Sequence, residues 1–162
     1  MPLLINQALA DDVWTQVTAE TLAENPSLPE GDVIVPLAYY LEQQAQLAAR
    51  AGRVGVLVNG DDDLPALFAL QNTVPLVASE FPVFRDGRGF SIARQLVRNG
   101  FDGEIRAVGD VAHDRLAYMR SVGFNAFQIP EARFSEADFS VFDEISVNYQ
   151  GTVADPRPVF RR

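Results

Sequence analysis

The chain contains no cysteine and no lysine. Without cysteine it has no disulfide, no thiolate nucleophile, no iron–sulfur or cysteine-type zinc ligand and no covalent haem attachment. Without lysine it has no Schiff-base chemistry and no lysine to hold the phosphates of a P-loop. All 13 basic residues are therefore arginine, a side chain that favours bidentate recognition of anions.

Positive charge and long apolar runs are also scarce. The formal net charge of -9 makes duplex nucleic acid and anionic membranes poor partners, because both require a positive surface. No apolar run approaches the roughly 20 residues of a membrane span. The first residues lack the basic start of a signal peptide. We therefore expect a cytoplasmic protein with no nucleic-acid or membrane partner.

The length of 162 residues suits a single α/β domain spanning 1–162. Turn-forming residues over 24–32 separate a hairpin and loop, 1–31, from a core, 32–146, and the proline-containing segment 147–162 reads as an extended tail. The hairpin is predicted to pair Leu3–Gln7 with Val13–Thr18.

Apolar runs alternate with helical patterns through the core. The predicted strands are Val33–Val35, Val54–Val58, Pro75–Ala78, Glu104–Val108 and Ala126–Ile129. This alternation predicts a parallel sheet of about five β/α units. Both an open doubly wound sheet and a partial (β/α) barrel fit, since a full barrel needs eight units.

Local signals predict where the helices begin and end. Asp62 or Asp63 caps one helix, and Ser91–Val97 forms another in which Ser91 can serve as the cap. Asp110 can cap a helix that ends at Gly123, and Ser135 opens a final helix with a capping box.

Ligands bind at the carboxyl ends of the strands in either architecture. This rule selects the residues that follow or end predicted strands: Asn59, Asp61, Glu80, Gly109, Asp110 and Gln128. The loop Arg85–Gly89 lies on the same side and precedes a helix, so its glycines and free amides can approach an anion. Arg85 and Arg88 add charge-assisted donors. The alternative is a solvated turn in which Asp86 pairs with an arginine.

Other chemistry is weakly indicated. His113 is the only histidine and suits either a general acid or base or an exposed helix position. The run Asp61-Asp62-Asp63 fits a helix cap better than a cation site, and we expect no metal. Gly87-Arg88-Gly89 lacks the third glycine and the preceding strand of a dinucleotide fingerprint.

Several segments resemble one uncharacterised bacterial family, whose members are labelled as oxidoreductases of sulfite reduction. The matching segments are Val35–Ala38, Gly52–Val56, Asp86–Ala93, Gly103–Val111, Gly123–Phe127 and Tyr149-Gln150, with a Pro-Val-Phe-Arg-Arg ending. Asp114 also matches, whereas His113 is not part of the family pattern and Arg115 stands where the family is expected to have Gln. The resemblance implies a place beside sulfite reductase in sulfur assimilation, but no defined reaction.

These observations yield two hypotheses. In the first, the chain is an accessory enzyme of sulfite assimilation, possessing a site that holds a small anion or phosphate. Either Asp86 or Asp110 would transfer protons, and the ligand-binding residues would be Glu80, Arg85, Gly87, Arg88, Gly89, Ser91, Arg106 and Asp114. Redox chemistry would require a bound cofactor, which the sequence does not identify. In the second, the chain is a non-catalytic binding or assembly partner of sulfite reductase or a related protein.

Overall fold

Eight strands form one sheet in this computed structural model, which describes residues 1–145 and 147–161. The predicted core and tail each end on a residue outside those ranges, Ser146 and Arg162. The strands are β1 (Leu3–Ile5), β2 (Ala8–Ala10), β3 (Trp14–Gln16), β4 (Asp32–Pro36), β5 (Val54–Val58), β6 (Leu76–Phe81), β7 (Glu104–Gly109) and β8 (Ala126–Gln128). The helices are α1 (Ala19–Glu24), α2 (Leu37–Glu42), α3 (Gln44–Ala48), α4 (Leu64–Leu70), α5 (Arg88–Arg98) and α6 (His113–Val122), with 3-10 turns η1 (Gln71–Thr73), η2 (Glu136–Phe139) and η3 (Val159–Arg161). None of the helices in the described ranges is long and apolar enough to cross a membrane.

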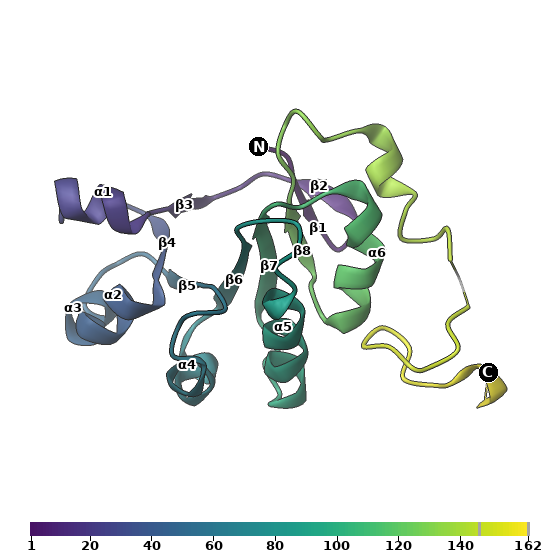
Figure 1. Ribbon diagram of the computed structural model, residues 1–162. Helices are drawn as coiled ribbons and strands as arrows, with labels where there is room; N and C mark the ends of the chain where they lie inside the picture. Colours follow the sequence, from purple (N-terminus) through teal and green to yellow (C-terminus); the bar gives the residue numbers. More distant parts are fainter. Residues whose placement is uncertain (146, 162) are drawn as a thin grey trace.

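The sheet is open and mostly parallel, with the order β2-β1-β8-β7-β6-β5-β4-β3. From β3 to β8, strands that follow one another in the chain are parallel neighbours, and β1 pairs antiparallel with β8. Figure 1 shows α2 to α6 along one face of a sheet that curls like half of a barrel. A doubly wound sheet reverses its strand order and carries helices on both faces. Of the two predicted architectures, the structure therefore has the partial barrel.

The N-terminal hairpin exists, but its predicted pairing is wrong. β1 pairs with β2 through a two-residue turn at Asn6 and Gln7, whose φ angles are 49° and 70°. Such a turn matches the twist of the flanking strands. The segment predicted as the second strand instead contributes β3, which pairs in parallel with β4 at the opposite edge of the sheet.

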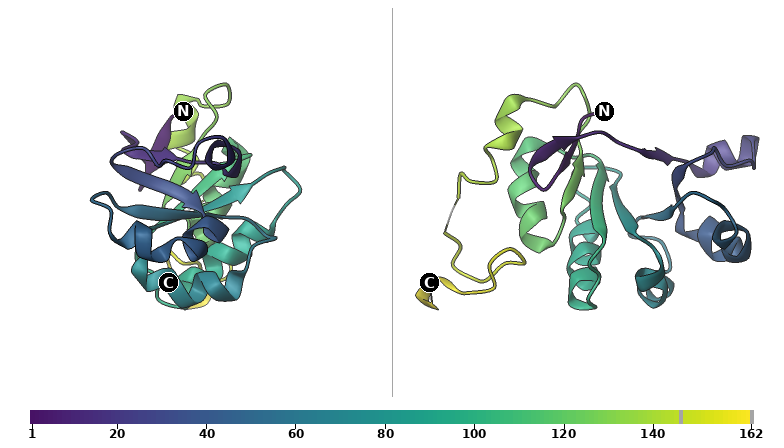
Figure 2. Two further views of the ribbon diagram at one scale, coloured as in Figure 1. Left: turned by 90° about the vertical axis from the view of Figure 1, so that its left-hand side faces the viewer. Right: turned by 180° about the vertical axis from the view of Figure 1, so that it is seen from behind.

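Side chains alternate between the two faces of each strand. On β7, Ile105 and Ala107 join the core beneath the helices, whereas Val108 packs on the other face. Arg106 lies between Ile105 and Ala107 in the sequence, so its side chain is on the same face of the sheet as Val108. The segment between β2 and β3 crosses this second face, where Trp14 packs, and Figure 2 shows it linking the two edges of the sheet.

Helix boundaries follow the predicted signals in part. Asp63 caps α4, and Gly123 ends α6 with a φ of 127°, as expected. α5 begins earlier than predicted, with Gly87 rather than Ser91 at its cap, and Ala112 rather than Asp110 precedes α6. The capping box at Ser135 is confirmed, although it opens the short turn η2 instead of an α-helix.

Candidate functional site

The carboxyl ends of β5 to β8 lie side by side because these strands are parallel neighbours. Phe81 at the end of β6 is in register with Gly109 at the end of β7, and the Asp110 N–H donates to the Phe81 carbonyl at 2.7 Å. Gly109 has a φ of 88°, and a Cβ there would lie 2.5 Å from that carbonyl oxygen. This turn therefore requires glycine.

Arg88 joins the loops that follow β5 and β6. Its guanidinium donates to Asp86 through Nε at 3.0 Å and Nη2 at 2.8 Å, and to Asp61 through Nη1 at 2.5 Å and Nη2 at 3.3 Å. The two carboxylates differ in accessibility: the Asp86 side chain is 13% exposed and the Asp61 side chain 81%. Asp86 is therefore the inner, better-held partner of Arg88, and Asp61 the outer one.

Glycine makes room for this contact. A Cβ on Gly60 would lie 2.2 Å from Nε of Arg88, so the arginine lies directly against the Gly60 backbone. The Arg88 N–H also donates to Oδ1 of Asp86 at 3.1 Å, which closes the loop ahead of α5. The two loops are thus held together by one side chain.

Hydrogen bonding keeps this cluster ionised. Donation from the Arg88 side chain, with further donation from the Arg88 N–H, lowers the pKa of Asp86 from 3.8 to about 2. The Arg88 side chain likewise lowers the pKa of Asp61, and the two carboxylates raise the pKa of Arg88. Arg85 is exposed and forms no ion pair within the described residues, so it adds a positive charge to the same loop.

The start of α5 is packed tightly onto β6. A Cβ on Gly89 would lie 2.6 Å from Cζ of Phe81 and 3.0 Å from Oγ of Ser79. Oγ of Ser79 is buried and has no hydrogen-bond partner in the described part of the chain. Ser91 is exposed and lines a groove between α5 and α6 instead of capping the helix.

Arg115 is a neighbour of this site that sequence reasoning missed. It is 7% exposed, and its guanidinium carbon lies 4.6 Å from the ring centre of Phe81 and 5.2 Å from those of Phe84 and Phe90. Its Nη1 donates to the Asp110 carbonyl at 2.9 Å. The three phenylalanines around the predicted loop were the available signal, since a buried arginine commonly stacks on aromatic rings.

The remaining strand-end groups form separate pairs. The Asp110 carboxylate accepts from Arg133, which follows β8. His113 Nδ1 lies 2.6 Å from Oδ1 of Asp138, a fully buried carboxylate that also accepts from the Ser135 N–H. This pair fixes η2 to the start of α6 and leaves the histidine 41% exposed.

Three predicted ligand-binding residues lie apart from Arg88. Glu80 is the register partner of Val108 on the neighbouring strand, and both lie on the face of the sheet away from the helices. Asp114 is exposed and lines a groove between α6 and the tail. Arg106 is buried, and its Nε donates to Glu104 at 2.7 Å while its Nη1 donates to Asp12 at 2.9 and 3.0 Å. Because Glu104 begins β7, these contacts direct the guanidinium toward the amino end of the strand.

The three consecutive aspartates after β5 diverge. Asp61 pairs with Arg88, Asp62 accepts from the Asn59 N–H at 2.7 Å, and Asp63 accepts from the Ala66 N–H at 3.1 Å. Across residues 1–145 and 147–161, no three histidine or carboxylate side chains are placed to share a metal ion.

The family model described as "Bacterial protein of unknown function (DUF934)" matches residues 55–160, which include β5 to β8 and Arg88. No curated protein matches the chain.

Proposed function

The chain belongs to this bacterial family, and we propose that it is an accessory protein of assimilatory sulfite reduction that binds a small oxyanion at Arg88. The place in sulfur metabolism is supported by the resemblance of the Asp86–Ala93 and Gly103–Val111 segments to proteins with that label. The anion is supported by the geometry of Arg88. An oxidoreductase reaction on such an anion would need a bound redox cofactor, because the chain has no cysteine.

The exposed Asp61 carboxylate on the outer edge of Arg88 is the observation that carries this proposal. A carboxylate and an oxyanion such as sulfite, sulfate or phosphate present similar oxygen pairs to a guanidinium. Asp61 is solvated and therefore easily displaced, whereas Asp86 remains to orient Arg88. Asp61 thus occupies the position that an oxyanion would take, and Arg85 adds positive charge beside it.

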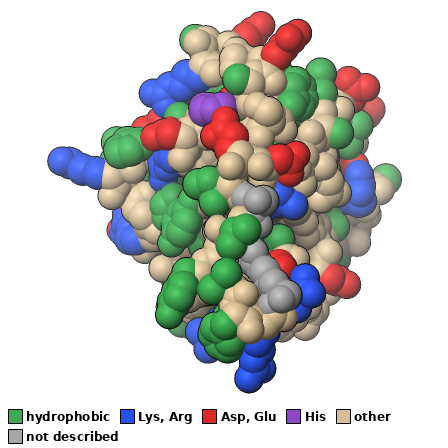
Figure 3. All heavy atoms as spheres, turned by 90° about the vertical axis from the view of Figure 1, so that its right-hand side faces the viewer, with side chains coloured by type: hydrophobic (Ala, Val, Ile, Leu, Met, Phe, Trp, Pro, Cys, Tyr) green, Lys and Arg blue, Asp and Glu red, His purple; other side chains and the backbone are tan. Residues whose placement is uncertain are grey.

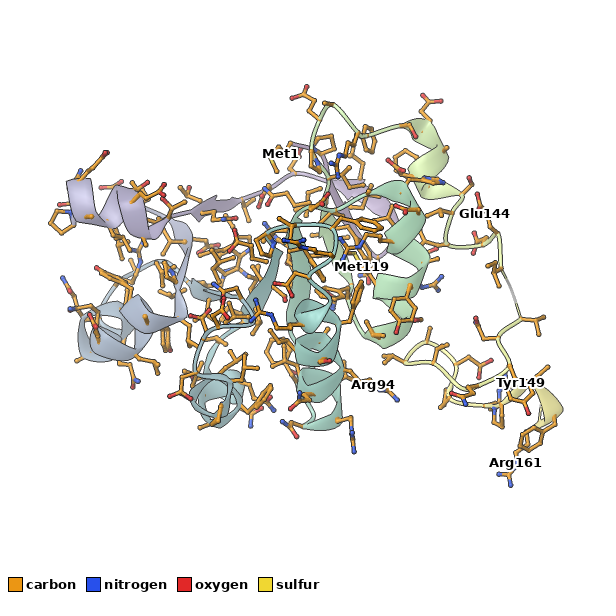
Figure 4. All side chains as sticks on the ribbon, viewed as in Figure 1. Met1, Arg94, Met119, Glu144, Tyr149 and Arg161 are labelled. Carbon is orange, nitrogen blue, oxygen red and sulfur yellow. The ribbon has the colours of Figure 1, made fainter. Side chains whose placement is uncertain are left out.

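Isothermal titration calorimetry of the purified protein with sulfite, sulfate and phosphate tests this site. We expect Arg88→Gln to weaken binding by about tenfold or more, because it removes a charge-assisted bidentate contact. Asp61→Asn should strengthen binding, because it removes the competing carboxylate. Arg94→Gln is the matched control, since Arg94 lies exposed on α5 (Figure 4) and loses the same charge. Absence of binding, or an equal loss in the control, contradicts the proposal.

A second candidate function is a non-catalytic partner of the sulfite reduction machinery. The tail favours it, because Tyr149 is 78% exposed and Phe160 74% exposed. Arg157 and Arg161 lie close to Phe160 in sequence, and Figure 3 shows hydrophobic side chains on the face that carries the tail. Aromatic side chains beside arginine are typical of contact surfaces between proteins.

Pull-down with sulfite reductase separates the two functions. The accessory-enzyme proposal predicts that anion binding depends on Arg88 and is unchanged in a Tyr149→Ser, Phe160→Ser double variant. The partner proposal predicts that this double variant loses the reductase while Arg88→Gln retains it. A gene-deletion strain that grows on sulfite as its sulfur source as well as its parent would contradict both.

A further inference from the structure

A cavity lies at the amino ends of β7 and β8, the opposite ends of the strands from Arg88. It has a volume of about 360 Å³, within the range of small-molecule sites. It is bounded by the start of β7 near Gly103, the start of β8 near Asn125 and the hairpin turn at Asn6 and Gln7. We call it the amino-end cavity.

The floor of the amino-end cavity is apolar and firmly held. Phe101, Phe124 and Phe127 line it and are themselves buried. The Asn125 side chain fixes one wall, because its Oδ1 accepts from the Ile105 N–H at 2.8 Å and its Nδ2 donates to the Gly103 carbonyl at 3.1 Å. The wall is therefore preformed, and Phe101, which is 8% exposed, is the phenylalanine with the most surface open to a ligand.

The tail forms the outer wall. The Val153 N–H donates to the Ser121 carbonyl at 3.0 Å, in the last turn of α6. The last carbonyls of a helix have no partner within it, so this bond satisfies one of them and holds Val153 and Ala154 against the cavity. The tail therefore shapes the cavity as well as presenting exposed aromatic residues.

Arg120 supplies positive charge at the wall that the cavity shares with the groove between α6 and the tail. It lies in the last turn of α6, is half-buried, and uses Nη1 to donate to the Phe142 carbonyl at 3.3 Å. Asp102 also lines the cavity but is exposed, so water screens its charge more strongly than that of Arg120. The arrangement favours a ligand with an anionic end near Arg120.

Gln7 adds a polar group to the rim of the amino-end cavity. Its φ of 70° is a conformation that glycine adopts freely and glutamine rarely does. Its side chain lines the cavity and makes no hydrogen bond within the described residues. The two-residue hairpin turn accounts for this backbone conformation, so the unpaired amide is what Gln7 offers to a ligand.

We infer that the amino-end cavity binds a small apolar carboxylate. The apolar part lies on Phe101, and the carboxylate accepts hydrogen bonds from Arg120. The Gln7 amide at the rim donates to the same ligand. This site is independent of the proposed oxyanion site, which lies at the other ends of the strands.

Titration with phenylacetate, monitored by the chemical shifts of backbone amides in NMR spectra, tests the inference. We expect saturable shifts in residues 101–105 and 120–127, none of which inorganic phosphate should reproduce. Phenylacetamide, which lacks the charge, should bind about tenfold more weakly or worse. Absence of saturable shifts with phenylacetate overturns the site, and equal binding of the amide overturns the role of charge.

Variants locate the contacts. Arg120→Gln should weaken phenylacetate binding by about tenfold or more, while Arg94→Gln leaves it unchanged. Val153→Trp should fill the cavity and abolish binding, which keeps the test valid if the Arg120 variant folds poorly. Gln7→Gly should raise the melting temperature yet weaken binding. An equal loss in Arg94→Gln overturns the site, and a Gln7→Gly protein with unchanged affinity overturns the role of Gln7.

Discussion

Arg88 and Arg106 each bind two carboxylates, but in opposite surroundings. The Arg88 side chain is 49% exposed at the carboxyl ends of the strands, and its outer partner Asp61 is in water. The Arg106 side chain is 1% exposed on the face away from the helices, beneath the segment that contains Asp12. Nη2 of Arg106 has no partner among the described residues.

The comparison separates a replaceable contact from a permanent one. An exposed ion pair contributes little to stability because water can replace either partner. A buried arginine has lost its hydration, so removing it or a partner is costly. The exposed cluster is therefore suited to exchange Asp61 for a ligand, and the buried one to hold the Asp12 segment on the sheet.

Arg106→Ala should give the largest effect and tests this contrast directly. We expect the free energy of unfolding to fall by about 3–5 kcal/mol, because Asp12 and Glu104 lose their shared buried partner. Urea denaturation measures the change. Arg88→Ala is the control and should lower the midpoint far less, because water can replace the partners of an exposed guanidinium. Similar midpoints for the two variants would remove the distinction between the clusters.

Gly89→Ala should give an intermediate effect and tests whether the backbone beneath Arg88 is rigid. Its Cβ would meet the buried ring of Phe81 at 2.6 Å, so we expect a loss of about 1–3 kcal/mol in unfolding free energy. Gly87→Ala is the control, because its nearest contact, Cδ2 of Phe90, would be at 3.7 Å. Equal melting temperatures for the two variants would show that α5 shifts easily.

Lowering the pH should have the smallest effect on stability, and it tests the exposed cluster of Asp86 and Arg88. The pKa of Asp86 is lowered to about 2, so its ion pair with Arg88 contributes fully above the unfolded value of 3.8 and is lost as the pH falls toward 2. Urea midpoints of the parent and Asp86→Asn should differ most at pH 6 and converge below pH 4. A difference that persists at pH 2 would contradict this assignment.

Much of the fold could be predicted because the buried strands carry their own signal. The run Val54–Val58 is apolar throughout, and it forms β5. The hairpin pairing failed because β1, β2 and β3 have three residues each, too few to show a period. Its tight turn also lacks glycine, the usual marker of a two-residue hairpin.

The candidate site was predictable in position more than in detail. The strand-end rule selected Asp61, and the loop that contains Asp86 and Arg88 was predicted on the same side. The pairing of Asp86 with Arg88 matches the ion pair of the solvated-turn alternative, whereas the pairing of Asp61 with Arg88 was not predicted. Alternation of side chains along β7 predicts which face of the sheet Arg106 lies on. It does not predict that the segment containing Asp12 covers Arg106, because Asp12 is 94 residues away in the chain. The stacking of Arg115 on Phe81 is likewise a tertiary contact, so the phenylalanines around the loop indicate a surface for a cation but not which arginine binds there.

The pairing of β1 with β8 determines the order in which the sheet can be completed. β1 precedes the other strands of the sheet, yet Leu3 pairs with Gln128 in β8, the last of them in sequence. During synthesis β1 must wait until β8 has emerged, whereas β3 to β7 can pair in turn. Docking of the hairpin is therefore a late folding step, and the growing chain exposes the edge of β7 until β8 arrives.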